Sequence, residues 1–299
     1  MIRNFDELIQ SVKGSQTKVI AVAYAHDPDV LEAIAKAQRE DIAGGILVGP
    51  KDKIEKAAAS VKVSLAPFEI VDIADEKEAT RAAVALVREG KADVLMKGLC
   101  NTATILGAVL DKQTGLRDAK LLSHIAAFEI ASYPKLIILS DAAMNIAPTL
   151  EDKIAITENA IQVANRLGIE MPKVAIIAAV EKVNPQGMPC TADAAIIATM
   201  GARGQIKNAI IDGPLAVDNA FSTHACEVKG IKSPVGGDAD IVITPNIETG
   251  NCFYKVMSYL AGAKTAGIIV GARKPIVLTS RADSEETKFL SIAFAMKVS

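Results

Sequence analysis

The sequence predicts an α/β protein whose strands form mostly parallel sheets. Three observations support this fold class: apolar runs of strand length alternate with helical periods, half of the 299 residues are apolar, and only 4% are aromatic. Many of the apolar residues are Ala, Ile and Val, a composition typical of buried parallel strands covered by Ala-rich helices. A chain of this length exceeds the usual size of one core, so two domains are favoured over a single large α/β unit.

The first part of the chain repeats a strand followed by a helix. The N-terminal segment MIRNFDELIQ has the pattern of an amphipathic helix. Strands are then expected at residues 19–25, 44–49, 68–73 and 92–98, and helices near residues 28–40, 51–59 and 75–89. Repeated strand–helix units of this kind predict a parallel sheet.

The middle of the chain begins with two apolar runs that lie too close together for a helical crossover. LLSHIAAFEI and YPKLIILSD are separated by only a few residues, which predicts antiparallel edge strands. A second strand–helix series follows. Its strands are expected at residues 173–180, 209–217 and 239–246, and its helices near residues 150–167, 191–202 and 250–262.

The last segment predicts a hairpin and a final helix. AGIIVG and PIVLTS, joined by ARK, form the hairpin, and a helix starts at about Ser284. This helix is expected to return the chain to the first domain. The predicted domains are therefore residues 1–134 plus 270–299, and residues 135–269.

Charge and cysteine usage narrow the class of protein. The net charge is −2, from 33 basic and 35 acidic residues, without a Lys/Arg-rich block, so a nucleic acid is not an expected partner. The apolar stretches are of strand length and the N-terminus carries acidic residues, which favours a soluble cytoplasmic protein without membrane contact. The four cysteines lack CxxC spacing, so neither a disulfide framework nor a metal site is expected.

Several common catalytic motifs are absent. The sequence has no GxxxxGK[ST] loop, no GxGxxG after a strand, no GxSxG and no HExxH, so P-loop kinases and dinucleotide enzymes lose support. His26, His124 and His224 lie far apart, and a hydrolase triad would need residues that only tertiary structure brings together. Cys100 and Cys252 have no histidine beside them, which favours small buried hydrophobes over nucleophiles.

Polar residues follow three of the predicted strands. The carboxyl ends of parallel strands, next to helix N-termini, are where open α/β sheets bind anionic ligands. The first such corner, MKGLCNT, contains Lys97, Gly98, Asn101 and Thr102, which offer a cation and free N–H groups to an anion. The alternative is structural: a glycine turn with an Asn or Thr N-cap.

The second corner, ITPNIETGNCFYK, contains Asn246, Gly250, Asn251 and Lys255. The clustering of two asparagines with a glycine favours a substrate-binding loop. The alternative is a polar loop before a helix, with Lys255 in solvent.

The third corner, TSRADSEE, is the most specific. Ser280 and Arg281 come just after a buried strand, so the guanidinium can grip a phosphate and the hydroxyl can bond a carbonyl or oxyanion. Asp283 and Glu286 are candidate catalytic acids. Their spacing is also that of a capping box, which is their structural alternative.

These motifs resemble the phosphate acetyl/butyryltransferase family, and its phosphate butyryltransferase branch in particular. The likeness spans nearly the whole chain and rests on MKGLCNTATIL, LLSHIAAFEI, LSDAAMNIAPTLEDK, DGPLAVDNAFS, SPVGGDADIVITPNIETGNCFYK and PIVLTSRADS. The resemblance implies two α/β domains of the isocitrate/isopropylmalate dehydrogenase-like architecture, with antiparallel edge strands. It also implies a homodimer or higher homo-oligomer and an active site in the interdomain cleft.

The implied reaction is acyl-CoA + phosphate ⇌ acyl phosphate + CoA, with butyryl or short branched chains favoured. In the family both substrates bind in a ternary complex, an acid side chain deprotonates the CoA thiol, and the thiolate attacks the acyl phosphate carbonyl. CoA is a substrate, and no metal or other cofactor is implied. Carried onto matching positions, Ser280 contacts the carbonyl or oxyanion and Arg281 binds phosphate, while the other two corners line the cleft.

One position departs from the family pattern. Acetyl-transferring members have a catalytic Asp six residues after the Arg, where this chain has Thr287. Asp283, Glu285 and Glu286 are nearby acids, and Asp283 or Glu286 is the expected base. Two alternatives stay open: a catalytically silent protein that binds CoA or acyl phosphate, and an NAD- and metal-dependent dehydrogenase of the same fold. The dehydrogenase needs clustered acids, and the available aspartates are spread over different loops: Asp141, Asp212, Asp218, Asp238 and Asp240.

Overall fold

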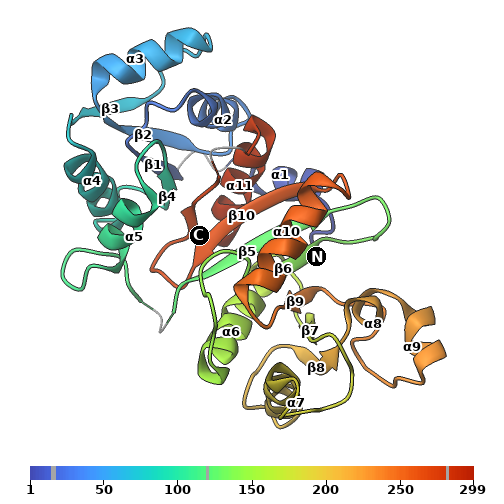
Figure 1. Ribbon diagram of the computed structural model, residues 1–299. Coiled ribbons are helices and arrows are strands. Elements are labelled where there is room, and N and C mark those ends of the chain that lie inside the picture. Colours follow the sequence, from blue (N-terminus) through green and yellow to red (C-terminus); the bar gives the residue numbers. More distant parts are fainter. Residues whose placement is uncertain (15–17, 119–120, 281–282) are drawn as a thin grey trace. The chain divides into compact units, whose positions relative to one another are not determined.

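The computed structural model describes residues 1–14, 18–118, 121–280 and 283–299 (Figure 1). The chain divides into two compact units. We call Phe5–Lys120 together with Ala266–Ser299 the N-terminal unit, and Met1–Asn4 together with Leu121–Thr265 the central unit. The C-terminal segment thus belongs to the same unit as the first strands of the chain.

The limits of these units differ from the expected boundaries near residues 134 and 270. The chain leaves the N-terminal unit after Lys120 and re-enters it at Ala266. The segment LLSHIAAFEI, expected in the first domain, forms β5 (Ser123–Glu129), which pairs antiparallel with β6 (Ile137–Ser140). Because backbone pairing ties a strand to its neighbour, β5 lies with β6 in the central unit.

The N-terminal unit is an α/β structure with a mostly parallel sheet. Its strand order is β3-β2-β1-β4-β11, and these neighbours are all parallel. β11 also pairs antiparallel with β10 (Lys264–Val270), which confirms the expected hairpin. The other elements are β1 (Val19–Ala23), β2 (Gly44–Gly49), β3 (Glu69–Asp72), β4 (Val94–Lys97), β11 (Ile276–Val277), α1 (Phe5–Val12), α2 (Pro28–Arg39), α3 (Lys51–Ser60), α4 (Glu76–Arg88), α5 (Thr102–Leu110) and α11 (Glu285–Val298).

The order of the strands creates a switch point at the carboxyl ends of β1 and β4. The chain runs from β1 through α2 to β2 in one direction along the sheet, and from β3 through α4 to β4 in the other. Right-handed crossovers in opposite directions place α2 and α4 on opposite faces of the sheet. The loops that follow β1 and β4 therefore diverge, and this is the position at which open α/β sheets bind ligands.

Helix α11 is buried on nearly all sides, which fixes the place where it begins. Phe289, Ile292, Phe294 and Met296 are 3% exposed or less, and the helix packs on α1, α2 and β11. A helix that is apolar all round is a core helix. The last two residues of the third corner, Glu285 and Glu286, are the first two of α11, so the end of this corner belongs to a rigid element.

The central unit is a second α/β structure. Its strand order is β5-β6-β9-β7-β8, in which β6, β9, β7 and β8 are parallel and β5 pairs antiparallel with β6, as expected. The remaining elements are β7 (Lys173–Ile177), β8 (Ile210–Leu215), β9 (Ile241–Ile243), α6 (Leu150–Arg166), α7 (Pro189–Ala202), α8 (Val217–Phe221), α9 (Thr223–Lys229) and α10 (Ile247–Tyr259).

Two elements of the central unit differ from the sequence expectation. β9 covers only Ile241–Ile243 rather than residues 239–246, and α10 begins at Ile247 rather than at residue 250. The early start of α10 follows from Asn246, whose side chain accepts a hydrogen bond from the N–H of Thr249 at 3.0 Å and caps the helix. Within the described ranges, no helix is long and apolar enough to cross a membrane.

Candidate functional site

Three adjacent strands of the N-terminal unit end at the same edge of its sheet. β1, β4 and β11 are parallel neighbours, with Ala23 opposite Lys97 and Val277 opposite Met96. The segments that follow these strands begin at residues 24, 98 and 278. This register brings the corner around Lys97 to the same edge as Ser280. Two corners that are distant in sequence therefore share one site region.

The first corner packs against the end of β1. The N–H groups of Gly98 and Leu99 donate to the carbonyls of Ala23 and Tyr24, both at 2.9 Å. A Cβ on Gly98 would collide with the Tyr24 carbonyl and lie 2.8 Å from that of Ala23, so only glycine fits. Lys97 is 7% exposed, and its ammonium donates to the Gly98 carbonyl at 3.1 Å. The glycine is thus structural, and Lys97 is a largely enclosed cation.

The side-chain carboxylate of Glu76 lies at the N-terminus of α5. Asn101 is the N-cap, but its side chain accepts no capping hydrogen bond. Its backbone N–H donates to Oε1 of Glu76 at 2.9 Å, and its Nδ2 donates to the same oxygen at 3.2 Å. The Asn101 N–H is the main reason that the pKa of Glu76 lies below its ordinary value. Thr102, the first helical residue, is exposed.

The loop after β1 adds two aromatic side chains that the sequence analysis did not select. Tyr24 has a left-handed backbone, with φ of 58°, and its ring meets that of His26 edge-on with centroids 4.4 Å apart. Strained residues of this kind cluster at functional sites. Partial burial, reinforced by Lys53, lowers the pKa of His26, so its imidazole is neutral at pH 7. Their position after a parallel strand is the signal that identifies them.

In the third corner, Asp283 forms two hydrogen bonds with Ser280. The Asp283 carboxylate accepts a hydrogen bond from the N–H of Ser280 at 2.7 Å, and its own N–H donates to the Ser280 carbonyl at 3.2 Å. Ser280 is exposed to solvent. Arg281, the expected phosphate ligand, lies outside the described residues. Asp283 thus holds the backbone of Ser280 in place.

The capping-box alternative for Asp283 and Glu286 is wrong by one residue. The N-cap of α11 is Ser284, whose hydroxyl oxygen accepts a hydrogen bond from the N–H of Thr287 at 3.2 Å. Thr287 occupies the third helical position, and its hydroxyl accepts a hydrogen bond from Ser284 at 3.2 Å. Glu286 is exposed. Neither acid is therefore used as a cap of α11.

A buried lysine ties this turn to its surroundings. Lys288 is 1% exposed, and its ammonium donates to the backbone carbonyl of Asp283 and to Oδ2 of Asp29 at 3.2 Å. Asp29 belongs to the first turn of α2, so Lys288 joins α2, α11 and the third corner. Lys288 is not among the predicted site residues. The available signal was a lysine inside an otherwise apolar helix, which needs a partner when buried.

The second corner lies in the central unit, at the carboxyl ends of β6 and β9. Asn246 is the N-cap of α10. A Cβ on Gly250 would collide with the carbonyl of Asp141 and lie 2.8 Å from Oγ1 of Thr244, which again requires glycine. Nδ2 of the exposed Asn251 donates to the carbonyl of Ala142 at 3.2 Å. The first turns of α10 are therefore held against the loop that follows β6.

Lys255 does not simply extend into solvent. Its ammonium lies 5.1 Å from the ring centroid of Tyr254 and 5.4 Å from that of Tyr259, distances at which a cation is attracted to an aromatic face. The residue is partly buried. These two rings hold the cation on the surface of α10.

The cysteines differ in their exposure. Cys100 and Cys226 are buried, Cys252 is exposed, and all are free thiols. Burial raises the pKa of Cys100, which keeps its thiol protonated at pH 7 and unsuited to nucleophilic attack. The expectation of a small buried hydrophobe therefore holds for Cys100 and is wrong for Cys252, which faces outward from α10.

The aspartates considered for a metal site have local partners. Asp238 and Asp240 each form a salt bridge with Lys135 at 2.7 Å, and Asp218 forms one with Lys229 at 2.9 Å. Among the residues that the structure describes, no group of three or more His, Cys, Asp or Glu side chains is placed to hold a metal ion.

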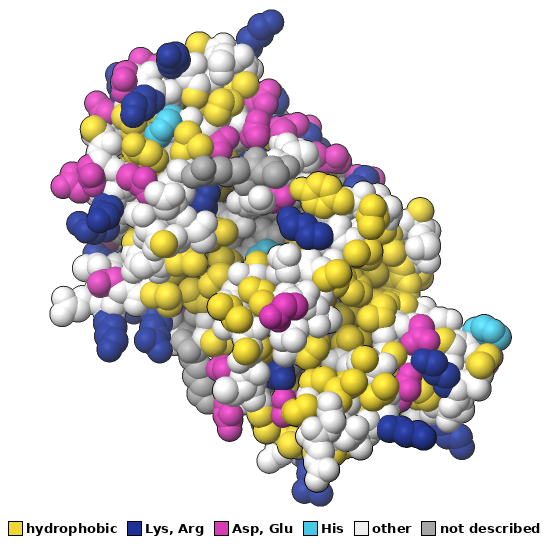
Figure 2. All heavy atoms as spheres, in the orientation of Figure 1, with side chains coloured by type: hydrophobic (Ala, Val, Ile, Leu, Met, Phe, Trp, Pro, Cys, Tyr) yellow, Lys and Arg dark blue, Asp and Glu magenta, His cyan; other side chains and the backbone are white. Residues whose placement is uncertain are grey.

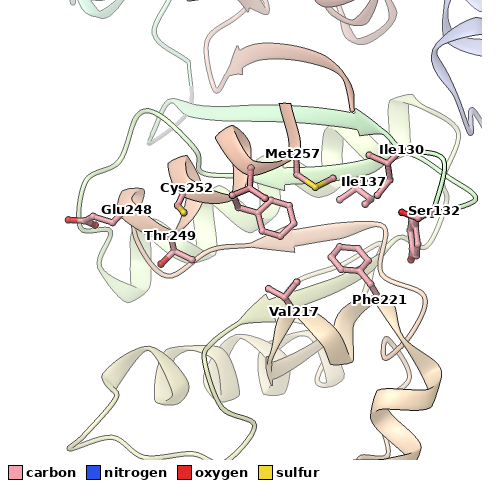
Figure 3. Close-up of a pocket in the computed structure, with 12 residues that line it drawn as sticks. Ile130, Ser132, Ile137, Val217, Phe221, Glu248, Thr249, Cys252 and Met257 are labelled. Carbon is pink, nitrogen blue, oxygen red and sulfur yellow. The ribbon is translucent and has the colours of Figure 1, made fainter. Parts of the chain in front are cut away.

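A separate hollow of about 910 Å³ lies within the central unit, beside the outer face of α10. Val217 and Phe221 on one side face Met257 and Ile137 on the other, as Figure 3 shows. The hollow is mostly apolar, and Figure 2 shows hydrophobic side chains gathered on this part of the unit. Exposed apolar side chains continue around it: Val217 is 40% exposed, Val256 44%, Tyr259 61% and Leu260 81%.

Comparisons with known proteins cover nearly the whole chain. The family model described as "Phosphate acetyl/butaryl transferase" matches residues 4–82 and 76–296. The chain is 50% identical over 298 residues to phosphate butyryltransferase of Clostridium acetobutylicum, covering 100% of this chain and 99% of the relative. It is 45% identical over 290 residues to phosphate acetyltransferase of Thermotoga maritima, covering 97% and 98%.

Solved structures show the same relationship. The crystal structure of a branched-chain phosphotransacylase from Enterococcus faecalis V583 is similar, with a TM-score of 0.84 and 36% identity over 94% of this chain and 98% of that chain. A 4-hydroxythreonine-4-phosphate dehydrogenase from Burkholderia phymatum shares the fold alone, with a TM-score of 0.58 and 15% identity over 94% and 98%. The chain therefore belongs to the phosphate acetyl/butyryltransferase family.

Proposed function

We propose that this protein transfers a butyryl or short branched acyl chain between coenzyme A and inorganic phosphate, by the reaction acyl-CoA + phosphate ⇌ acyl phosphate + CoA. The full-length family match carries this conclusion, and it makes the protein a phosphate acyltransferase. The chain preference is supported by the 50% identity to a phosphate butyryltransferase and by the branched-chain phosphotransacylase structure. Each methylene contributes only about 1 kcal/mol of burial, so acetyl transfer at a lower rate is expected as well.

In the proposed reaction both substrates are bound before any bond changes. The CoA thiol loses its proton to an acid side chain, the thiolate forms a bond to the acyl carbonyl carbon, and the carbon–oxygen bond to phosphate breaks. The Ser280 hydroxyl donates to the carbonyl oxygen as charge develops there, and Arg281 holds the phosphate. Lys97 and Thr102 from the first corner and Asn246 and Lys255 from the second bind the substrates, as does Asn251.

The proton acceptor is assigned from the contacts around the third corner. The Asp283 carboxylate is engaged with the N–H of Ser280, whereas Glu286 is exposed. We therefore assign the thiol proton to Glu286 and the orientation of Ser280 to Asp283. Thr287 is the third residue of α11, where its hydroxyl accepts a hydrogen bond from the N-cap Ser284. Its side chain has no carboxylate that could accept the thiol proton.

The reaction as proposed runs in the cytoplasm and uses no metal or prosthetic group. CoA takes part as a substrate and is not a bound cofactor. The isocitrate/isopropylmalate dehydrogenase-like architecture, with the substrates in an interdomain cleft, stays a prediction from the resemblance. Activity is expected to survive incubation with a chelator.

The function is tested by following free thiol release from butyryl-CoA, with and without phosphate. We expect release that depends on phosphate and that is faster with butyryl-CoA than with acetyl-CoA. Binding of CoA without release from either thioester, in folded protein, would identify a silent binding protein and would point to Thr287 as its cause.

We also propose that the protein is a homodimer that associates through the apolar face of α10. Val256, Tyr259 and Leu260 are exposed next to an apolar hollow. Together they form a contiguous apolar surface, whereas the apolar residues on the surface of a monomer are usually scattered singly. A twofold axis through such a face would bury it against the same face of a second copy. Cys252, exposed near the middle of α10, would then be shielded.

A charge on this face is expected to separate the subunits. Light scattering should give twice the 31.4 kDa chain mass for the wild type and one chain mass for Val256→Glu. Val228→Glu is the matched control, because Val228 is 72% exposed on α9 and does not line the hollow. A wild-type monomer, or equal masses for the two variants, would contradict this assembly.

A further inference from the structure

A buried carboxylate stands at the carboxyl end of β6. Asp141 is 3% exposed. Its Oδ1 accepts hydrogen bonds from the N–H groups of Ala143 at 2.8 Å and Met144 at 2.9 Å. Its Oδ2 accepts from Nδ2 of Asn145 and from the N–H of His124 at 3.3 Å. Four donors surround the carboxylate, as a charge buried to this extent requires.

These bonds fix the carbonyl groups of the loop that follows β6. The Asp141 carbonyl accepts a hydrogen bond from the Thr244 hydroxyl at 3.0 Å, and the next carbonyl accepts one from Asn251 at 3.2 Å. Gly250 lies so close that a Cβ there would collide with the Asp141 carbonyl. The loop therefore contacts both the end of β9 and the first turns of α10, which carry the second corner.

The Asp141 carboxylate also joins this loop to β5. The two donors to Oδ1 come from the loop's own backbone, and a serine or asparagine could close that turn. His124 lies in β5, and Asn145 donates a further hydrogen bond to the carbonyl of Leu122 at 2.9 Å. A carboxylate with two oxygens is needed to join the loop to β5 in this way.

We propose that Asp141 is a positioning residue for acyl transfer. Its carboxylate sets the direction of the loop carbonyls, the carbonyl of Ala142 orients the Asn251 side chain, and Asn251 binds the substrate. This inference rests on the proposed function, in which Asn251 is a substrate ligand. Displacements of about 1 Å at such a ligand reduce rates by about 10²-fold, so a rigid loop is a requirement of the site.

The test changes the charge of the side chain and keeps its size. Asp141→Asn retains one acceptor oxygen but turns an amide donor toward the donors of Asn145 and His124. We expect kcat/KM to fall about 10²-fold. In the double variant Asp141→Asn/Asn145→Asp, the new amide at position 141 can donate to the new carboxylate at position 145, so the hydrogen bond between the two positions is restored in the opposite direction. About tenfold of the loss should return, and the rescue is partial because the Leu122 carbonyl loses its donor.

A matched variant separates positioning from loss of stability. Lys153 is 6% exposed and pairs with Asp193 at 2.7 Å, a salt bridge that joins α6 to α7 rather than the loop to β5. Lys153→Met should lower the thermal midpoint at least as much as Asp141→Asn, because it leaves a carboxylate without its partner. Its kcat/KM, measured well below both midpoints, should stay unchanged.

The outcomes distinguish this inference from the function on which it rests. With an active wild type, a loss in Asp141→Asn no larger than in Lys153→Met overturns the inference alone, as does a folded double variant without any recovery. A folded wild type without phosphate-dependent thiol release overturns the proposed function, and this inference with it. The expected result is a loss specific to Asp141→Asn, partly recovered in the double variant.

Discussion

Gly98→Ala is expected to unfold the N-terminal unit several degrees earlier and to impair activity strongly. The added Cβ would meet the carbonyls of Tyr24 and Ala23, which are backbone atoms and cannot move aside cheaply. Overpacking of this kind costs about 1–3 kcal/mol, which corresponds to a drop in thermal midpoint of roughly 4–8 °C for 2 kcal/mol. Because the same movement displaces Lys97 and the start of α5, kcat/KM should fall by about tenfold or more.

Gly107→Ala provides the matched control for that substitution. Gly107 lies on the exposed side of α5, and nothing stands within 4 Å of an added Cβ. Alanine in a helix interior is favoured over glycine by about 0.5–1 kcal/mol, so the thermal midpoint should rise slightly and activity should stay unchanged. Equal effects of the two substitutions would contradict the close approach of β4 and β1 described for Gly98.

Ser280→Ala and Arg281→Ala are expected to lose most of the transferase activity while the protein stays folded. Ser280 is exposed and lies three residues after β11, so removal of its hydroxyl leaves the packing intact. Loss of one donor to a developing oxyanion reduces kcat by about 10²–10³-fold. Loss of the guanidinium should raise KM for phosphate as well, because a forked, charge-assisted contact is removed. Initial rates at varied phosphate and butyryl-CoA measure both effects.

Ser222→Ala is the control that shows whether loss of activity is specific to the Ser280 hydroxyl. The Ser222 side chain accepts a hydrogen bond from the N–H of Ala225 at 3.1 Å and caps α9 in the central unit. Ser222→Ala should cost about 1 kcal/mol of stability and leave kcat unchanged. If Ser280→Ala and Arg281→Ala keep wild-type kinetics, the third corner is not the catalytic site.

The sequence pattern predicted those parts of the fold that local chemistry determines. Strand–helix alternation located the parallel strands, and the short gap between LLSHIAAFEI and YPKLIILSD predicted the antiparallel pair that β5 and β6 form. Where one side chain decided the outcome, the pattern was less reliable. With Asn246 as its cap, α10 begins three residues before the expected start, and Ser284 rather than Asp283 caps α11.

The contacts that organise the site depend on long-range pairing, which periodicity does not contain. Glu76 reaches Asn101 because α4 packs on α5, and Lys288 reaches Asp29 because α11 packs on α2. Asp141 directly follows β6, and Lys97 is the last residue of β4, so the position of Asp141 at a strand end was a usable signal. Its role depends on the donor from β5 and on the contact of its loop with α10, neither of which periodicity contains.

The most direct measurement of the central claim is isotope exchange between free CoA and butyryl-CoA in the absence of phosphate. In the proposed ternary complex the acyl group passes directly between CoA and phosphate, so labelled CoA should enter butyryl-CoA only when phosphate is present. Exchange without phosphate, at a rate close to turnover, would mean that the acyl group rests on a protein side chain. That result would contradict direct attack by the CoA thiolate and the roles given to Ser280, Arg281 and Glu286.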